Sequence, residues 1–348
     1  MLDFISFVWS TDPGILELGS FFTLHWSVLV VGLGLFLAFE LFYRTLSKES
    51  FPKKKSELLF GAGLLISLIG AKICATIFKG SSNIDNLTEI EFSLSGGILF
   101  LLAFCIFLTK KSPRTQLLNL LDTAVFSLLL FLTFQQASLF LEPGNWGKQT
   151  ESKFGVVFTN EAESILAGVF DKIDTVQIKK IENIADVGQV PVSINIDFID
   201  ELKDQQEAET FLNKDFKKSI VFYEVFNQHV RVDSVKPLEF SINKVENQKL
   251  QAEVKAIGIL RHPTMLYKAL FILIVFTALI YYRNKLPKGM AAGLGILLLL
   301  LGLTTLNFLF ANKFSWDVVS ENSLSLILFS ASAFYLVKLP ELSVSKSS

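Results

Sequence analysis

Residue types that build metal and redox sites are scarce in this chain. Its 348 residues include two cysteines and three histidines. Cys74 and Cys105 both fall in apolar runs, which favours small buried side chains over a disulfide or a metal pair. The three histidines, His25, His229 and His262, do not have the spacing of metal ligands. We therefore expect no metal ion and no cofactor.

Concentrated positive charge is also missing. The net charge at pH 7 is −1, so nucleic acid is not an expected partner. Residues 1–20 contain no Lys or Arg, and a cleavable signal peptide is therefore not expected.

Apolar sequence, in contrast, is abundant. Hydrophobic residues make up 51% of the chain, 34 residues are Phe, and the mean hydropathy is +0.48. This composition indicates several membrane spans and a modest polar domain. We predict a polytopic α-helical membrane protein with seven transmembrane helices. The predicted spans are Phe22 to Tyr43, Leu58 to Phe78, Phe92 to Leu108, Leu117 to Leu141, Leu266 to Tyr282, Met290 to Phe310 and Leu324 to Leu336.

The short loops predict the orientation of these spans. Most Lys and Arg residues follow the first, third and fifth spans or lie in the C-terminal tail, whereas the opposite short loops carry only Lys79 and Lys313. Because cytoplasmic loops are enriched in Lys and Arg, the N-terminus is expected outside and the C-terminus in the cytoplasm.

A polar segment divides the chain into three predicted domains. Residues 1–147 form an N-terminal membrane region, 148–260 an extracytoplasmic domain, and 261–348 a C-terminal membrane region. The polar segment is mildly acidic, so an anionic partner for it is not favoured.

Alternating and amphipathic patterns predict a small α+β fold for residues 148–260. Val192 to Phe198 alternates apolar and polar residues, as a half-buried strand does. Asp204 to Ile220 has the pattern of an amphipathic helix. Leu238 to Ile242 and Leu250 to Ala256 are predicted to form a hairpin.

The stretch Arg261 to Tyr267 joins the polar domain to the fifth span. Pro263 suits a first helical turn, because its φ angle is fixed and it has no N–H. Arg261, His262 and Tyr267 are side chains typical of a membrane–water interface. This stretch is interpreted as the re-entry point into lipid, with an interfacial anchor as the simplest role.

Polar residues within the spans are predicted to share one depth, in the outer leaflet. Two interpretations stay open: a polar pocket beneath the external domain, or polar and small residues that pack helices together. Lys72 favours the pocket, because a charge in a membrane needs a cavity, a partner or a route to the surface. The polar positions are Lys72, Ser95, Gly96, Gly97, Gln135, Gln136, Thr304, Thr305 and Asn307.

Several stretches in order resemble the bacterial prolipoprotein diacylglyceryl transferases. They are Asp12 to Gly14, Leu24 to Trp26, Gly70 to Ile73, Ser95 to Gly97, Asp122 to Gly147, Lys153 to Phe158 and Arg261 to Tyr267. The resemblance implies a seven-span fold in the bacterial inner membrane. It also implies an activity: transfer of a diacylglyceryl group from phosphatidylglycerol to the lipobox cysteine of a prolipoprotein.

The residues that carry this chemistry in the family are replaced. Ser95 stands where the family has its catalytic histidine, and Gln136 where it has an essential arginine on the fourth span. Leu301 to Leu309 lacks the family's tyrosine, arginine and glutamate. None of the five arginines falls within a predicted span, and Lys72 cannot form a bidentate phosphate fork.

Two functions from different classes are favoured over a transporter or an unrelated lipid binder, for which the sequence shows no broken helix. The first is a non-catalytic scaffold or subunit of an envelope lipoprotein or secretion complex, with protein partners bound through residues 148–260. The second is a divergent, active transferase in which His262 is the base and Lys72 and Arg261 hold the phosphate. In both, a phosphatidylglycerol-like phospholipid is a possible ligand. The candidate lipid-cavity residues are His25, Trp26, Lys72, Ser95, Gly96, Gly97, Gln136, Thr305, Arg261, His262 and Tyr267.

Overall fold

The computed structural model divides into two compact units, each built from separate stretches of the chain. The α+β unit comprises Met1–Trp26 and Phe140–Thr264, and the helical unit comprises Ser27–Leu139 and Met265–Ser348. The structure describes residues 7–9, 14–18, 22–48, 52–79, 92–110, 113–142, 144–152, 154–181, 190–200, 202, 204–244, 249–310, 327–328, 331–332 and 335.

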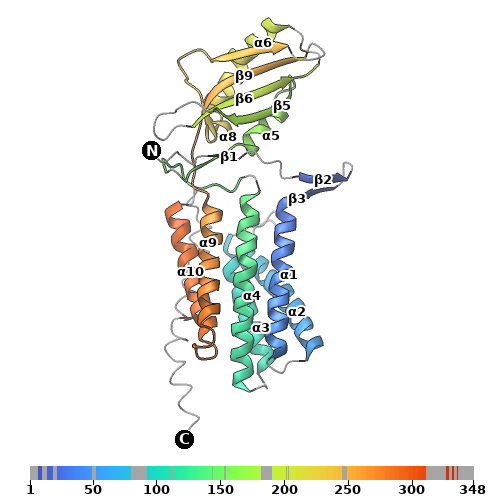
Figure 1. The fold of residues 1–348 in the computed structure, drawn as a ribbon, viewed down its shortest axis with the longest axis vertical. Coiled ribbons are helices and arrows are strands. Elements are labelled where there is room, and N and C mark those ends of the chain that lie inside the picture. Colours follow the sequence, from blue (N-terminus) through green and yellow to red (C-terminus); the bar gives the residue numbers. More distant parts are fainter. Residues whose placement is uncertain are drawn as a thin grey trace. The chain divides into compact units, whose positions relative to one another are not determined.

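The described part of the helical unit contains six helices (Figure 1). Five of them are long and apolar enough to cross a membrane, and α3 is shorter. The helices are α1 (Trp26–Lys48), α2 (Lys53–Lys79), α3 (Leu94–Thr109), α4 (Arg114–Phe140), α9 (Thr264–Tyr282) and α10 (Met290–Phe310).

Two of the seven predicted spans need comment. Helix α3 has 16 residues. That length corresponds to about 24 Å, which is less than the ~30 Å hydrocarbon core of a bilayer. The seventh predicted span, Leu324 to Leu336, lies mostly outside the described residues.

The first predicted span begins later than expected. Residues Phe22–His25 form the strand β3, which pairs antiparallel with β2 (Gly14–Leu18), and α1 begins only at Trp26. Aromatic and β-branched residues such as Phe22 and Thr23 favour extended backbone, and the hydrophobic run alone does not reveal this change of structure.

Glycines allow α2 and α3 to pack closely. A Cβ atom at Gly96 would lie 2.8 Å from the backbone oxygen of Gly70, and one at Gly97 would lie 3.3 Å from that of Ser67. Ser67 Oγ also donates a hydrogen bond of 3.1 Å to Gly97 O. Small residues at such contacts are a common way of joining membrane helices.

Asp122 on α4 holds the start of α10. Its Oδ2 accepts a hydrogen bond of 2.7 Å from Gly289 N, and its Oδ1 accepts one of 2.8 Å from Ala292 N. Gly289 has a φ angle of +82°, which residues with a side chain rarely adopt. A carboxylate at the first turn of a helix satisfies N–H groups that have no partner in the helix and interacts well with its dipole.

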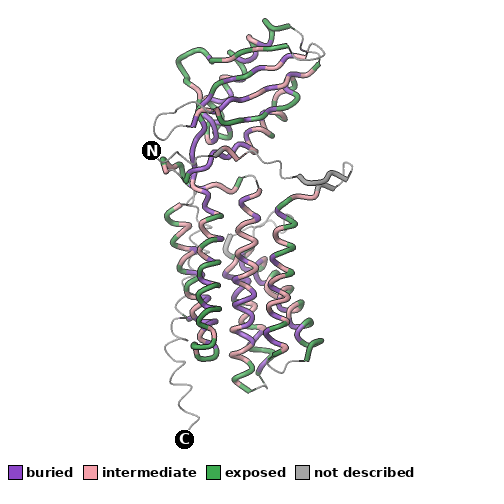
Figure 2. Tube along the Cα trace, viewed as in Figure 1, coloured by how far each residue is buried: buried purple, intermediate pink, exposed green. Residues whose placement is uncertain are grey.

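The α+β unit contains an antiparallel sheet that carries its core. Strands β5, β6, β9 and β7 lie in that order, and β8 also pairs with β9. Much of β6 and β9 is buried (Figure 2). The core residues on these two strands include Ile194, Ile196 and Val254. The strands are β5 (Ile173–Lys180), β6 (Val190–Phe198), β7 (Val230–Arg231), β8 (Phe240–Lys244) and β9 (Leu250–Gly258).

The patterns read in residues 190–258 are confirmed. Strand β6 covers the predicted 192–198, and β8 and β9 form the predicted hairpin. The predicted helix at 204–220 is present as α6 (Gln205–Phe211), a π-helical turn (Leu212–Phe216) and α7 (Lys217–Phe222). The remaining helices of the unit are α5 (Asn160–Val169) and α8 (Glu224–Asn227).

The α+β unit is larger than the predicted domain 148–260. Strand β1 (Phe7–Trp9) pairs in parallel with β4 (Val156–Phe158), and the Trp9 ring lies 4.7 Å from that of Phe140. Contacts between distant parts of the sequence therefore bring residues before 27 and around 140 into this unit.

Candidate functional site

Several predicted cavity residues meet where α2 packs against the start of α3. Ser93 N donates to Ala71 O at 3.1 Å, and Ser93 Oγ accepts from Gly96 N at 3.2 Å, which caps α3. The Lys72 ammonium lies 4.8 Å from the centroid of the Phe92 ring. Ser95, in the same place, is 1% exposed. For Gly96 and Gly97 the contacts described above match the helix-packing interpretation.

The other predicted residues of the helical unit lie on other helices. The Gln136 amide donates to the Gln135 side chain at 2.8 Å. Thr305 lies on the exposed face of α10, and its hydroxyl donates to Leu301 O of the same helix. The Tyr267 ring contacts that of Phe310 at 5.3 Å. The structure does not bring Thr305 into a pocket among the described residues.

His25 and Trp26 lie at the junction between β3 and α1. His25 is the last residue of the strand, opposite Gly14, and Trp26 begins the helix with 47% of its surface exposed. Such an exposed Trp at a helix end is typical of a membrane–water interface.

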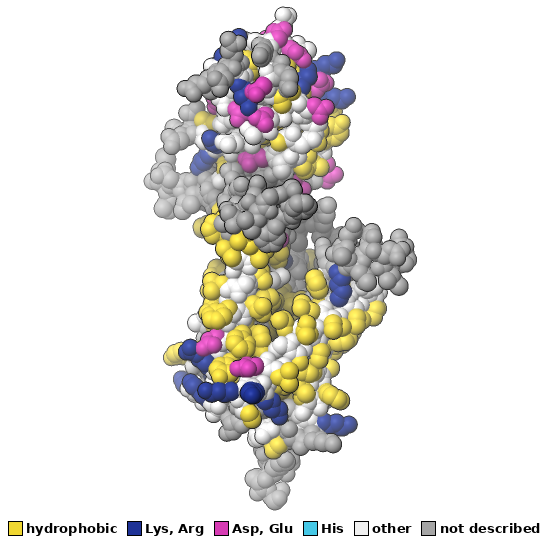
Figure 3. Space-filling model, turned by 90° about the vertical axis from the view of Figure 1, so that its right-hand side faces the viewer, with side chains coloured by type: hydrophobic (Ala, Val, Ile, Leu, Met, Phe, Trp, Pro, Cys, Tyr) yellow, Lys and Arg dark blue, Asp and Glu magenta, His cyan; other side chains and the backbone are white. Residues whose placement is uncertain are grey.

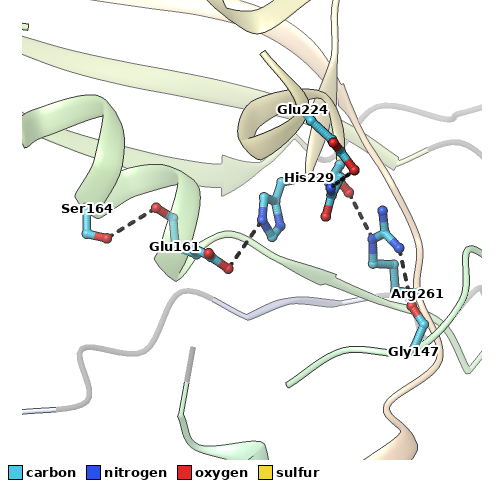
Figure 4. Close-up of polar contacts among 7 residues, drawn as sticks. Gly147, Glu161, Ser164, Glu224, His229 and Arg261 are labelled. Carbon is cyan, nitrogen blue, oxygen red and sulfur yellow. Dashed lines mark hydrogen bonds and ion pairs between the residues drawn. The ribbon is translucent and has the colours of Figure 1, made fainter. Parts of the chain in front are cut away.

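Arg261 corrects the interpretation of its stretch as an interfacial anchor. It is 6% exposed, and its guanidinium donates two hydrogen bonds to backbone carbonyls of the α+β unit (Figure 4). Arg261 Nε donates to Gln228 O at 2.9 Å, and Nη1 donates to Gly147 O at 3.2 Å. Burial lowers the pKa of Arg261, but a guanidinium remains charged at any ordinary pH. Arg261 thus joins two loops of this unit instead of extending to an interface.

His262 continues this connection through its backbone. Its N–H donates to Lys148 O at 3.0 Å, and its carbonyl accepts from Gly147 N at 2.9 Å. Burial lowers the pKa of His262, so its imidazole is neutral at neutral pH.

A buried histidine that the sequence analysis did not select lies beside Arg261. His229 is 1% exposed, its ring packs edge-on against Trp146 at 4.6 Å, and its Nε2 lies 3.8 Å from Glu161 Oε2. Figure 4 shows Glu161 pointing toward His229 from α5. Burial lowers the pKa of His229 to about 4; the Phe158 carbonyl opposes this shift, and the positive charge of Arg261 adds to it. His229 is therefore neutral at physiological pH.

The His229 cluster borders a small pocket with an empty volume of about 210 Å³. The geometry offers no nucleophile next to a base, and the described residues contain no group of three or more His, Cys, Asp or Glu that could hold a metal ion. The arrangement suits structural support of the loops around residue 146. The pocket is lined by Trp9, Glu142, Gly144, Trp146, Phe158, Asn160, Glu161 and His229.

The burial of His229 could not be read from the sequence. The residue precedes the two-residue strand β7, and His229 O accepts a hydrogen bond from Ile259 N at 2.9 Å. Its position therefore depends on pairing with β9, which is far away in the chain. Among the motifs predicted from the sequence, the Arg261 stretch that follows β9 is the one that lies beside His229.

Together, the long apolar helices and the mixed α+β unit define a polytopic membrane protein. Comparison with protein families agrees: the model described as prolipoprotein diacylglyceryl transferase matches residues 13–337. The chain belongs to this family. No curated protein matches it.

Proposed function

We propose that this protein is a non-catalytic member of its family that serves as a membrane scaffold subunit in an envelope lipoprotein or secretion complex. The observation that carries the proposal is the replacement of the reacting groups. Ser95, at the position of the family's histidine, is 1% exposed and cannot buffer a proton near neutral pH. The position of the essential arginine holds Gln136, whose amide is neutral.

The departing glycerol phosphate of the family's reaction needs a cationic partner. All five arginines lie at helix ends or outside the helices of the helical unit. Arg44 pairs with Glu40 in the last turns of α1, Arg114 is the first residue of α4, and Arg283 follows α9. Lys72, in the stretch Gly70 to Ile73 that resembles the family, supplies a point charge without the bidentate geometry of a guanidinium.

One observation favours the alternative, an active transferase. The neutral imidazole of His262 could accept the proton of a lipobox thiol. The same alternative assigns Arg261 to the phosphate, whereas the guanidinium bonds two carbonyls of its own unit. We therefore place the non-catalytic function first.

The proposed location is the bacterial inner membrane, with the N-terminus and the α+β unit outside and the C-terminus in the cytoplasm. The support is the distribution of Lys and Arg among the short loops. A phosphatidylglycerol-like lipid remains the proposed ligand of the candidate cavity residues.

Exposed aromatic residues on the α+β unit support a protein partner. Phe222, the last residue of α7, is 74% exposed, and the next residue, Tyr223, which precedes α8, is 56% exposed. Large aromatic side chains are enriched among the residues that dominate protein interfaces.

The partner can be tested by the mass of the native particle after mild solubilisation. We expect the wild-type chain, of 38.9 kDa, in a larger complex of defined mass, and expect the double change Phe222→Ser and Tyr223→Ser to release it as a smaller particle. Val235→Ser is the matched control, because Val235 is 89% exposed but lies in the turn before β8. A wild-type particle with the mass of the single chain would refute the subunit proposal.

A further inference from the structure

The pocket beside His229 combines aromatic rings with carboxylates. Its aromatic members are Trp9, Trp146 and Phe158, and its acidic members are Glu142 and Glu161. All of them belong to the α+β unit. The faces of aromatic rings attract cations, and carboxylates attract them through their charge. The lining therefore favours a positively charged group over an anion.

His229 adds a buried acceptor to this lining. Its side chain is 1% exposed, and neither ring nitrogen makes a hydrogen bond of ordinary geometry within the described part of the chain. Figure 4 shows the imidazole and the Glu161 carboxylate pointing toward each other, but at 3.8 Å their atoms are too far apart for a hydrogen bond. One nitrogen of a neutral imidazole is an acceptor. Because buried polar groups nearly always have partners, this nitrogen indicates a donor that comes from outside the chain.

The space inside the lining admits one small group. The centre of a water-sized group can occupy about 10 Å³ there. A single buried water needs about the same, ~10–15 Å³. An ammonium is a compact point charge of similar size, whereas a guanidinium is a plane of one carbon and three nitrogens. The space therefore suits an ammonium better than a guanidinium.

One positive charge of the protein lies near the pocket. The Arg261 guanidinium is 5.9 Å from the Trp146 ring, and it donates to the carbonyls of Gln228 and Gly147. The two carboxylates of the lining exceed this charge by one. On the surface of the α+β unit, acidic and basic side chains are interspersed (Figure 3). The preference for a cation is therefore local to the pocket.

The pocket can be reached from solvent. A Cβ atom at Gly144, which is part of the lining, would have nothing within 4 Å. The Glu161 side chain is 33% exposed, although its Oε2 atom is buried. A flexible side chain with a charged end can therefore enter beside Gly144 and bring that end to the carboxylate.

We propose that this pocket binds the ammonium group of a lysine side chain presented by a partner protein. The carboxylates of Glu142 and Glu161 offset its charge, and His229 accepts one of its hydrogen bonds. The rings of Trp9 and Trp146 cover the methylene stem, as apolar surfaces commonly do for lysine. The inference deepens the proposed function and rests on it for the existence of a protein partner.

The site is tested with acetyl-lysine methylamide, titrated into the full chain in detergent with fluorotryptophan in place of tryptophan. Fluorine NMR signals of Trp9 and Trp146 are assigned by changing each residue to Phe. We expect both signals to shift in a saturable way, and expect acetyl-norleucine methylamide to bind at least tenfold more weakly. Norleucine has the same number of side-chain carbons but no ammonium. Equal affinity for the two probes would overturn the proposal.

The carboxylates are tested by the double change Glu142→Gln and Glu161→Gln. We expect the Kd of the lysine probe to rise about tenfold, because the ammonium loses its charged partners. The matched control is Glu239→Gln with Glu253→Gln, which removes the same charge from exposed positions of the same unit outside the lining. An equal rise in both double variants would overturn the site, since only the overall charge would then matter.

Two further probes distinguish the lysine side chain from other cations. Acetyl-arginine methylamide is expected to bind more weakly because its head is larger, and methylammonium because it lacks the stem that packs on the rings. Equal affinity for methylammonium and the lysine probe would overturn the assignment to a lysine side chain. These titrations need no partner, so they decide the site separately from the particle mass that tests the subunit function.

Discussion

Replacing Arg261 by leucine is expected to remove a large part of the stability of the α+β unit. The guanidinium is 6% exposed and donates to Gln228 O and Gly147 O, so its loss leaves two carbonyls without these donors. Hydrogen bonds from a charged group contribute about 1.5–3 kcal/mol each, so the expected loss from two of them is about 3–6 kcal/mol. Domains are typically stable by only 5–15 kcal/mol, so this loss is large. Arg261→Lys is expected to recover part of it, because one ammonium does not reproduce the fork of a guanidinium.

The measurement is denaturant unfolding of the full chain in detergent, followed by the fluorescence of Trp146, which packs near Arg261. Arg231→Leu is the matched control, because Arg231 is exposed on β7 of the same unit and its replacement should change the free energy of unfolding by less than about 0.5 kcal/mol. Equal unfolding midpoints for Arg261→Leu and Arg231→Leu would show that the buried guanidinium does not hold these loops together.

Acidification is expected to destabilise the α+β unit through His229. Burial keeps the pKa of this histidine at about 4 in the folded protein, compared with about 6.5 in an unfolded chain. Between these values the unfolded state binds the proton and the folded state does not, so stability is highest above pH 6.5 and falls as the pH falls toward 4. From pH 6.5 to pH 5 the expected loss is about 2 kcal/mol, at 1.36 kcal/mol per pH unit.

This contribution is isolated by comparing the wild type with His229→Gln. The variant lacks the imidazole. Between pH 6.5 and pH 5 its free energy of unfolding should therefore fall by about 2 kcal/mol less than that of the wild type, whatever its stability at pH 7. Parallel pH profiles for the two proteins would mean that His229 takes up its proton as readily in the folded state as in the unfolded one.

The sequence predicted those elements whose signal lies in neighbouring residues. Continuous apolar runs located α2, α4, α9 and α10 to within a few residues. Alternation located the β8–β9 hairpin, where Phe240 faces Val254. In each case the residues of one segment are enough to predict the element, because an alternating pattern has the period of a strand and a long apolar run has the length of a membrane helix.

Other features depend on contacts between distant segments. Strand β5 was not predicted, because a register shift between Ile173 and Thr175 interrupts its alternation. The burial of Arg261 depends on the carbonyls of Gly147 and Gln228, which are distant in the chain and accept hydrogen bonds from its guanidinium.

An apolar pocket among the helices α1 to α4 was also beyond the reach of the sequence. Polar residues were expected to mark a ligand site, yet this pocket is lined mainly by apolar side chains and arises from how four helices pack. Which lining side chains leave a space, such as those around Gly63, is decided by the facing helices and not by the residues nearby in the chain.

The proposed non-catalytic function requires that the family scaffold be present without the groups that carry the reaction. The most direct measurement is to incubate the purified protein with phosphatidylglycerol and a lipobox peptide and to weigh the peptide by mass spectrometry. The account predicts that the peptide keeps its original mass in the presence of wild-type protein and of His262→Ala alike. A diacylglyceryl peptide formed by the wild type and lost in a folded His262→Ala variant would contradict it.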